Sequence, residues 1–425
     1  MSYLEPIILG IYSILGPGMW GFYSVGLEAG RRKMVLMKRP PHPIRGQPPH
    51  VSILIPAKDE GERIRDCIES ALKQDYPEFD VVAIDDRSTD NTGAVMDQIA
   101  AANPRLHVVH VTKPPEQGWT GKNNALFQGG KHATGSWLLY VDSDVLLQPD
   151  ALSVAMSVVL RKEFDMLSLL PRLESHSFWE GLLIPLCAGA ASTMYVIALS
   201  NKNEMPKQAF ANGQFLLISR SAYDSIGGHE TVRDRYCEDV AIARLMKSRG
   251  LRPRISWGNE FCSVRMYDSL AAIIRGWSRI YYAARVGSPW RILAALLFLV
   301  FCGLSAYGAL GWGIWRTLHP AGSVVSLSHL LLGPLWLLAS GFHLAYMMVG
   351  VGRIYRWSGN SGKYAAFLPL GGALLGYTLL RALKLCITKK VEWRGTAYSH
   401  TMQAVPGEEG PPAVSPRPEQ SQTVV

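Results

Sequence analysis

Residues 80–92 read DVVAIDDRSTDNT: an apolar, β-branched run ends in two acidic residues and leads into the start of a helix. The same order of strand and helix continues on both sides of this stretch. The expected strands cover residues 51–57, 80–85, 106–111 and 137–141, and the expected helices cover 62–74, 91–102 and 122–133. This alternation predicts βαβ units and a mostly parallel sheet, in which ligands bind beyond the carboxyl ends of the strands.

The composition indicates a soluble α/β domain joined to membrane helices. Only 18% of the 425 residues are charged, against about 25% in ordinary globular proteins. Charged residues are missing from a few long apolar stretches, while the rest of the chain has an ordinary content of charged residues. This pattern excludes a disordered, collagenous or fully soluble chain. The six cysteines form no CxxC pair and no zinc-like spacing, which argues against a disulfide scaffold and a structural zinc site.

The net charge of +9 comes from basic residues that lie beside the apolar stretches, and no nucleic-acid-binding motif accompanies them. Basic flanks are the positive-inside signature of membrane helices and attract anionic lipid headgroups. The residues concerned are Arg31, Arg32, Lys33, Lys38, Arg39, Arg275, Arg279, Arg285, Arg291, Arg381, Lys384, Lys389, Lys390 and Arg394. The predicted partner is therefore a lipid bilayer and not a nucleic acid.

Three stretches have the length and composition of membrane helices: residues 7–26, 292–314 and 330–351. Only Glu5 precedes the first and the basic residues follow it, so we expect a signal anchor with the N-terminus outside. Segment 364–380 is shorter, and a full crossing would place five basic residues outside. The charge bias therefore favours an interfacial or re-entrant segment there, so the predicted C-terminal membrane helices number two to three.

Residues 182–200 are also uncharged, but one crossing there would separate Asp144 from Asp239, which we expect in one site. We therefore predict an interfacial helix at 182–200. The predicted organisation is a transmembrane anchor at 1–39, a Pro-rich linker at 40–50, a catalytic domain at 51–286, membrane helices at 287–402 and a disordered tail at 403–425. The expected location is the cell membrane, multi-pass, with the catalytic domain in the cytoplasm.

Acidic residues at strand ends are the strongest candidates for chemistry. Asp85 and Asp86 follow an apolar strand, where carboxylates can accept from a ribose hydroxyl or a base N–H. Ser88 or Asp90 is expected only to cap the next helix. The pair Asp142 and Asp144 forms a DxD motif after another strand, and two such carboxylates can share Mg²⁺ or Mn²⁺ and neutralise a diphosphate.

Glu238 and Asp239 open another expected helix, at 240–249, after a Gly-Gly turn. These carboxylates either complement the helix dipole or supply a general base that deprotonates an acceptor hydroxyl. The residues alone leave both interpretations open. Asn212 and Gly213 precede an expected strand, and ordinary turn formation is as good an interpretation for them as ligand contact.

The motifs together, in this order, resemble the inverting family 2 glycosyltransferases of GT-A fold, an α/β, Rossmann-like architecture. The resemblance covers roughly residues 50–286 and extends to the membrane-anchored branch that glycosylates lipids, which includes hopanoid-associated, carotenoid-acid and ceramide glucosyltransferase-like enzymes. It rests on residues 56–60, 85–90, 142–144 and 238–239 for the family, and on 118–123, 265–267 and 276–279 for the branch.

The resemblance implies a role for each matched position. Asp239 would be the catalytic base, and Asp142 and Asp144 would bind the metal and diphosphate. The residues that would contact the nucleotide-sugar donor are Pro56, Ala57, Glu60, Asp85, Asp86, Lys122, Asp142, Ser143 and Asp144. Weaker candidates for contact with acceptor or diphosphate are Asn212, Gly213, Glu238, Arg275, Trp277 and Arg279.

The segment around Trp277 departs from the wider family, because the Arg-Trp order of its Q/R-x-x-R-W motif is absent. Arg275 and Arg279 could still clamp a diphosphate, or they could face lipid headgroups.

The sequence thus predicts a metal-dependent glycosyltransferase that moves a sugar, expected from a UDP-sugar, to a membrane lipid. A processive polysaccharide synthase and a non-catalytic lipid-binding scaffold stay open as alternatives. The sugar, the lipid and the oligomeric state are not specified by the sequence.

Overall fold

The structure is a computed structural model that describes residues 4–44, 46–195, 197–284, 289–319, 327–388, 390–393 and 396–399. The predicted tail at 403–425, Arg285, Lys389 and Arg394 lie outside the described residues. The chain forms two compact units. We call Met34–Pro171 with Tyr195–Val264 the sheet unit, and Met1–Lys33, Arg172–Met194 and Arg265–Thr401 the helical unit.

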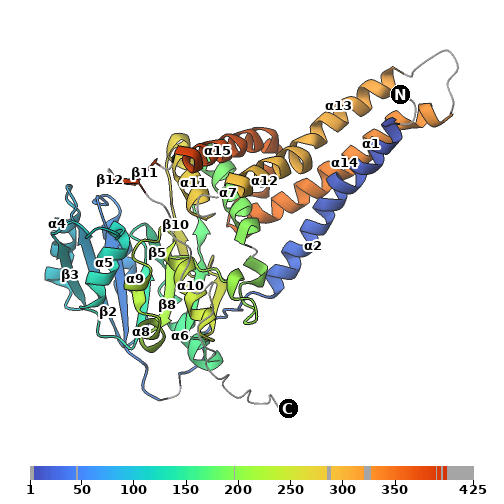
Figure 1. Ribbon diagram of the computed structural model, residues 1–425. Coiled ribbons are helices and arrows are strands. Elements are labelled where there is room, and N and C mark those ends of the chain that lie inside the picture. The colour runs from blue at the N-terminus through green and yellow to red at the C-terminus, as the bar shows by residue number, and fades with distance from the viewer. Residues whose placement is uncertain are drawn as a thin grey trace, which may run out of the picture. The chain divides into compact units, whose positions relative to one another are not determined.

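The sheet unit is built on a seven-stranded mixed sheet with the order β3-β2-β1-β4-β8-β6-β9 (Figure 1). The strands are β1 Val51–Ala57, β2 Phe79–Asp86, β3 Leu106–Val111, β4 Trp137–Val141, β6 Met166–Leu170, β8 Phe215–Ser219 and β9 Pro253–Trp257. Strands β1 to β4 are parallel to one another, and β8 runs antiparallel to both of its neighbours. The α/β prediction is confirmed, and the four predicted strands are the parallel half of the sheet.

Helices cover this sheet and bury most of it, except that His107 and His110 of the edge strand β3 are exposed. The main ones are α3 Ile64–Leu72, α4 Thr92–Ala102, α5 Gly121–Gly130, α6 Ala151–Lys162 and α10 Glu238–Ser248. The shorter α8 and α9 cover Arg220–Ser225 and Gly228–Thr231, and β5 Val145–Leu147 pairs with β10 Cys262–Val264. Continuous apolar strands such as β1 are typical of a sheet with both faces covered. In the register of β1 and β2, Ala57 lies level with Asp85.

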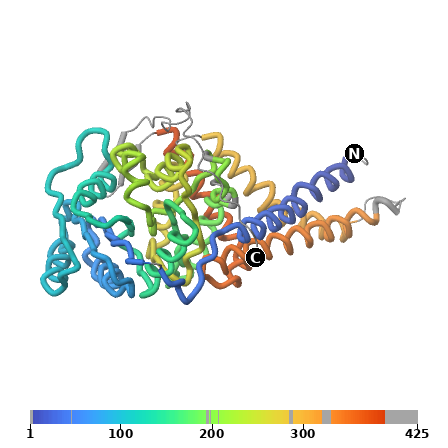
Figure 2. The backbone as a smooth tube through the Cα atoms, turned by 90° about the horizontal axis from the view of Figure 1, so that it is seen from below, coloured from blue at the N-terminus to red at the C-terminus, as the bar shows by residue number. Residues whose placement is uncertain are grey.

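Four helices of the helical unit, among the described residues, are long and apolar enough to cross a membrane: Leu4–Arg32, Pro289–Leu318, Leu330–Trp357 and Gly362–Thr388. The elements are α1 Leu4–Ser13, α2 Met19–Arg32, α12 Pro289–Leu299, α13 Ser305–Leu318, α14 Leu327–Trp357 and α15 Leu368–Thr388. In both views α1 and α2 run beside α14 (Figure 2). Helices of spanning length are thus present at the three predicted stretches, and the protein is membrane-associated. Segment 364–380, which the charge bias favoured as interfacial or re-entrant, lies in a fourth helix that is also long enough to cross.

Two helices from inside the predicted catalytic segment belong to this helical unit: α7 Phe178–Tyr195 and α11 Leu270–Ala284. Residues 180–187 of α7 are buried in this unit. The hydroxyl groups of Tyr281 and Tyr355 donate to the carbonyl oxygens of Cys187 and Leu182 there, at 2.9 and 2.6 Å. The apolar part of α7, Phe178–Ser192, is shorter than the four candidate spans. The remaining elements of the unit are β7 Arg172–Leu173 and the antiparallel pair β11 Lys390–Trp393 and β12 Thr396–Ser399.

Candidate active site

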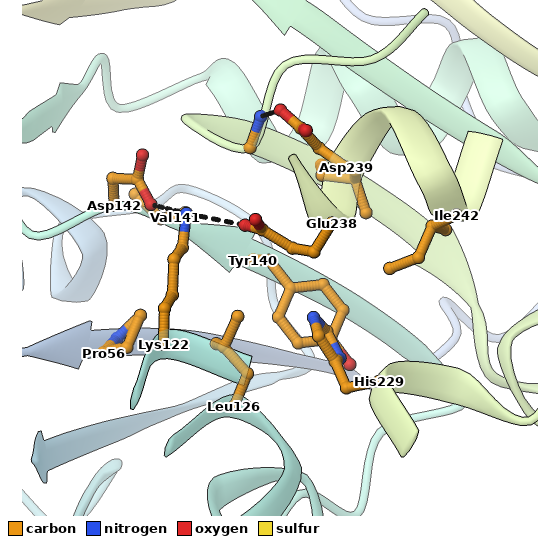
Figure 3. Close-up of a pocket in the computed structure, with 12 residues that line it drawn as sticks. Pro56, Lys122, Leu126, Tyr140, Val141, Asp142, His229, Glu238, Asp239 and Ile242 are labelled. Atoms are coloured by element: carbon orange, nitrogen blue, oxygen red, sulfur yellow. Dashed lines mark hydrogen bonds and ion pairs between the residues drawn. The ribbon is translucent and has the colours of Figure 1, made fainter. Parts of the chain in front are cut away.

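A pocket opens in the sheet unit beyond the carboxyl ends of β1 and β4 (Figure 3). Helices α5, α9 and α10, strand β8 and the loop before β8 contribute the other lining residues. The lining residues are Pro56, Lys122, Leu126, Tyr140, Val141, Asp142, Gly213, Leu216, His229, Glu238, Asp239 and Ile242. Predicted site residues from four separate motifs therefore meet in one place, as expected for ligand sites in parallel sheets.

Lys122 lies at the centre of this pocket and joins two of the motifs. Its Nζ is 2.7 Å from Asp142 Oδ1 and 2.8 Å from Glu238 Oε1. A cation in the first turn of a helix is unfavourable by itself, and the two carboxylates offset that cost. Desolvation alone would lower the pKa of Lys122, but the charges of Asp142 and Glu238 outweigh it and hold that pKa well above its usual value.

Asn123 fixes the position of Lys122 relative to α10. Its buried Nδ2 lies within hydrogen-bonding distance of the carbonyl oxygens of Val232, Arg233 and Arg235, at 2.8, 3.2 and 2.9 Å. The Oγ1 of Thr120 caps α5 by accepting from the backbone N–H of Asn123 at 3.2 Å. The chain that leads into α10 is therefore held against the start of α5, which brings Glu238 to Lys122.

Asp239 is held by two backbone donors. The N–H of Gly213 donates to its Oδ2 and the N–H of Val240 donates to its Oδ1, both at 2.7 Å. Desolvation in the pocket and the adjacent charge of Glu238 nevertheless raise the pKa of Asp239 to about 7. A pKa near neutrality is suited to a general base, because the group can both accept and release a proton.

The DxD residues follow β4. Desolvation, then the charges of Asp142 and Glu60, raise the pKa of Asp144 to about 7. Ser143 between them is buried. The oxygen atoms of Asp142, Asp144 and Glu60 are of the type that Mg²⁺ and Mn²⁺ prefer. Within the described parts of the chain, however, no group of three or more His, Cys, Asp or Glu side chains is already arranged around a metal position.

Asp85 and Asp86 point to opposite faces of the sheet, as neighbours in a strand must. Asp85 accepts from the backbone N–H of Ser88 at 3.0 Å and lies 3.1 Å from Nδ1 of His110. Asp86 is buried and accepts from Nε and Nη2 of Arg87, at 2.8 and 3.1 Å. The two acids predicted to hold the nucleotide therefore do not share one surface.

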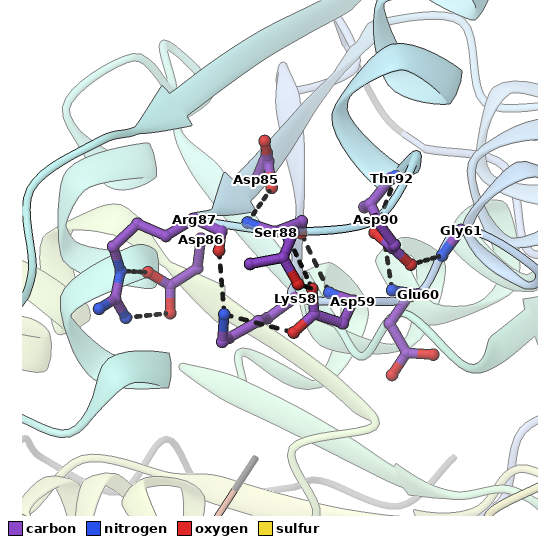
Figure 4. A network of polar contacts seen from close by, with 11 residues as sticks. Lys58, Asp59, Glu60, Gly61, Asp85, Asp86, Arg87, Ser88, Asp90 and Thr92 are labelled. Atoms are coloured by element: carbon purple, nitrogen blue, oxygen red, sulfur yellow. Dashed lines mark hydrogen bonds and ion pairs between the residues drawn. The ribbon is translucent and has the colours of Figure 1, made fainter. Parts of the chain in front are cut away.

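The loops after β1 and β2 are clasped together (Figure 4). Oδ1 of Asp59 accepts from the backbone N–H and the hydroxyl of Thr89, at 2.7 and 3.1 Å. Asp90 accepts from the N–H groups of Gly61 and Thr92, at 2.9 and 3.0 Å, just before α4, whose N-cap residue is Asn91. The Oγ of Ser88 accepts from the N–H of Asp59 at 3.0 Å.

Strained backbone occurs at both sides of this clasp. Asp59 and Arg87 have φ angles of 54° and 57°, in the left-handed region that non-glycine residues rarely adopt. Such strain persists where surrounding contacts enforce it and gathers at functional sites. The clasp sets the backbone next to Glu60, whose N–H donates to Oγ1 of Thr92 at 2.8 Å.

The sequence prediction missed His229, which lines the pocket beside Tyr140 (Figure 3). Burial, then the charge of Lys122, lowers the pKa of His229 to about 3, so its ring is neutral. Its Nδ1 lies 2.8 Å from the Tyr223 hydroxyl, and its ring meets Tyr140 edge-on with centroids 4.9 Å apart. The Gly227-Gly228 turn was a signal for this position, but nothing in the sequence showed that the next residue turns inward.

The weaker predicted contacts divide between the two units. Gly213 lines the pocket, whereas the Asn212 side chain closes a turn by accepting from the N–H of Gln214 at 3.2 Å. Arg275, Trp277 and Arg279 lie on α11 of the helical unit, where Arg275 is exposed and Trp277 is buried. A role for those three in diphosphate binding stays a prediction.

Comparison with known proteins identifies the domain. Residues 52–227 match the family described as "Glycosyl transferase family 2". The chain carries a family 2 glycosyltransferase domain. The predicted family, the transferase class and the GT-A fold are thereby confirmed. Glu238 and Asp239 lie beyond the matched range, so the glycosyltransferase match does not include the candidate base.

Curated relatives include the 4,4'-diaponeurosporenoate glycosyltransferases of Staphylococcus aureus strains MRSA252 and USA300, each 27% identical over 259 residues. The alignment covers 60% of this chain and 67% of each relative. Among solved structures, the mannosyltransferase PcManGT from Pyrobaculum calidifontis, in complex with GDP-Man and Mn²⁺, has 18% identity and a TM-score of 0.46, covering 90% of this chain and 98% of its own. TarS 1–349 of S. aureus in complex with UDP has 17% identity and a TM-score of 0.35, covering 85% and 99%.

Proposed function

We propose that this glycosyltransferase is a membrane-bound, inverting enzyme that moves a sugar from a UDP-sugar to a hydroxyl or carboxyl group of a membrane lipid. The observation that carries the proposal is the meeting of Asp142, Lys122, Glu238 and Asp239 in one pocket within a family 2 domain. The relatives named for diaponeurosporenoate act on a carotenoid acid, which supports a lipid-like acceptor with a carboxyl group. The four long apolar helices support an acceptor drawn from the bilayer.

In this proposal Asp239 removes the proton of the acceptor as the acceptor oxygen attacks the anomeric carbon. The two backbone donors hold its carboxylate in place, and its raised pKa makes it basic enough to accept a proton near neutral pH. A single displacement inverts the anomeric centre and needs no protein nucleophile. Lys122 would bind the departing diphosphate, and its charge would stabilise the negative charge that develops there.

Asp142 and Asp144, with Glu60 beside them, would hold Mg²⁺ or Mn²⁺. A bound divalent cation would neutralise part of the diphosphate charge. Within the nucleotide site, Asp86 and the clasped loops would contact the uridine, with Pro56 and Ala57 supplying the backbone of β1. We further propose a multi-pass protein of the cell membrane whose catalytic domain faces the cytoplasm.

The full chain, purified in lipid nanodiscs, tests this function. It would be supplied with radiolabelled UDP-sugars and with total membrane lipids, and the products would be separated by chromatography and identified by mass spectrometry. The proposal expects one lipid to gain one sugar with release of UDP, and roughly 10²-fold to 10⁴-fold slower product formation with Asp239→Asn. Long polymer chains would indicate a polysaccharide synthase, and donor binding without any transfer would indicate a non-catalytic scaffold.

A further inference from the structure

The pocket holds its own counter-ion. We infer that Lys122 occupies the cation position of the donor-free protein, and that a divalent cation binds tightly only when the donor diphosphate draws Lys122 away from Asp142. This inference rests on the proposed function, because it assigns an order of binding to the same site. Metal binding by the donor-free protein can nevertheless be measured separately from sugar transfer.

The contacts of Lys122 are those of a bound cation. Its ammonium group lies between two carboxylates that come from different elements, at 2.7 Å from Asp142 and 2.8 Å from Glu238 (Figure 3). Hydrogen bonds between charged groups at such distances are among the strongest in proteins. Among the twelve residues that line the pocket, Lys122 is the sole lysine or arginine. It therefore balances acidic residues that would otherwise repel one another.

A divalent cation would compete with Lys122 for the same oxygen atoms. Mg²⁺ binds carboxylate oxygens at about 2.0–2.1 Å. A cation at that distance from Asp142 would lie within roughly 5 Å of an ammonium group hydrogen-bonded to the same carboxylate, and the two positive charges would repel. Asp142 therefore cannot bind the Lys122 ammonium group and a divalent cation strongly at the same time. Either Lys122 moves away or the divalent cation binds weakly.

The protein ligands alone do not complete a metal site. The described residues include no ready-made cluster of three or more His, Cys, Asp or Glu side chains. Mg²⁺ usually combines one or two carboxylates with substrate phosphates, so the missing ligands would come from the diphosphate. The same diphosphate offers Lys122 a new anionic partner. Donor entry would therefore release Asp142 and supply metal ligands in one step.

Gly213 lies in contact with the side chains that take part in this exchange. A Cβ atom at this position would lie 3.3 Å from Lys122 Nζ and 3.4 Å from both Asp239 Oδ2 and Glu238 Oε1. Three functional side chains thus surround one glycine, which leaves space for the lysine to move past it. The absence of a side chain at Gly213 is consistent with a Lys122 side chain that changes its hydrogen-bond partners.

Mn²⁺ titration followed by electron paramagnetic resonance tests the inference on the full chain in detergent, without any sugar donor. We expect wild-type protein to bind Mn²⁺ weakly and Lys122→Met to bind it roughly 10-fold to 100-fold more tightly, since one charge-assisted interaction no longer competes. Adding UDP should tighten Mn²⁺ binding of the wild type by a comparable factor and that of the variant much less. Lys131→Met, on an exposed lysine at the end of the same helix, is the matched control and should behave as wild type.

Two further variants keep the test decisive. Lys122→Gln can still donate hydrogen bonds to both carboxylates and serves if Lys122→Met does not fold, whereas Lys122→Arg keeps the charge and should bind Mn²⁺ as weakly as wild type. Equal Mn²⁺ affinity of wild type and the neutral variants would overturn the inference. If UDP neither binds nor raises the affinity of any variant for Mn²⁺, the proposed function is contradicted instead. The Mn²⁺ affinities of wild type and variants without UDP still test the role of Lys122.

Discussion

The backbone N–H of Gly213 donates a 2.7 Å hydrogen bond to Oδ2 of Asp239, which ties the loop before β8 to the first turn of α10. Together with the bond from Val240 N–H, it fixes the orientation of this carboxylate without neutralising its charge. Each oxygen keeps further lone pairs for an acceptor proton. A catalytic base needs this kind of positioning, because a small misplacement of the reacting groups is costly in rate.

Asp239→Asn should retain donor binding and lose transfer by roughly 10²-fold to 10⁴-fold, the usual contribution of a general base. The amide can keep the contact with Gly213 but cannot accept the proton of the acceptor. Titration calorimetry with the UDP-sugar and turnover assays measure the two effects separately. Glu230→Gln, on an exposed acidic residue of α9, is the control and should leave both unchanged. A collapse of donor affinity with normal turnover per bound donor would instead make Asp239 a nucleotide or metal contact.

The pH dependence of the reaction follows from the same residue. Desolvation and the charge of Glu238 raise the pKa of Asp239 to about 7, so the carboxyl group is protonated and inactive as a base below that pH. We expect kcat/KM to rise by about tenfold per pH unit in the acidic range and to level off above about pH 7. Steady-state assays at saturating metal, with donor binding measured in parallel, check this. A flat profile across the acidic range would contradict the role of Asp239 as base.

The parallel half of the fold was predictable because its strands are continuous, β-branched and flanked by turns. The predicted strands 51–57, 106–111 and 137–141 have the observed bounds, and 80–85 differs by one residue at each end. The antiparallel strand β8, which β4 and β6 flank, could not be placed, because its pairing depends on contacts between segments far apart in the chain. The assignment of α7 and α11 to the helical unit was missed for the same reason.

The site was predictable as a set of residues but not as a set of contacts. Strand ends and helix starts marked Asp142, Glu238 and Asp239 as candidates, and the structure brings them together. The bridge made by Lys122 joins residues that are distant in sequence, so no local pattern could show it. The separation of Asp85 from Asp86 could have been predicted, because adjacent residues of a strand face opposite sides of the sheet.

Asp144→Asn should abolish turnover while the fold stays intact. The change removes a charged oxygen ligand, and it also removes the repulsion from Asp142 and Glu60 that contributes to the raised pKa of Asp144. We therefore expect the midpoint of thermal unfolding to stay the same or to rise slightly. Transfer assays and thermal unfolding of both proteins measure this. Full activity in the variant, or wild-type activity that survives exhaustive chelation, would contradict a metal role for the DxD motif.

Asn123→Ala should lower the free energy of unfolding by about 1–3 kcal/mol, because it leaves buried carbonyl groups of the segment before α10 without their donor. Activity should fall as well, since this contact holds Glu238 near Lys122. Denaturant titration of the purified chain measures the loss. Asn124→Ala is the matched control: Asn124 is also buried, but within the described part of the chain its side chain accepts a long hydrogen bond of 3.5 Å from Gln128 and does not contact the segment before α10. Equal effects of the two changes would show that the carbonyl contacts are not what stabilises this region.

Membrane topology provides the last prediction. Arg31 and Arg32 end the first candidate span and Lys33 follows it, so the chain should enter the cytoplasm there. Activity reporters fused after residue 50 and after residue 260 should both lie in the cytoplasm, because α7 is too short to count among the candidate spans and because Asp142 and Asp239 share one pocket.

A third reporter, fused after residue 319 between the second and third candidate spans, is the internal control and should lie on the opposite side. Protease protection of the same fusions in inverted vesicles gives an independent readout. Reporters after residues 50 and 260 on opposite sides would mean that α7 crosses the membrane. Such a crossing would separate Asp142 from Asp239, and the pocket could not be the active site.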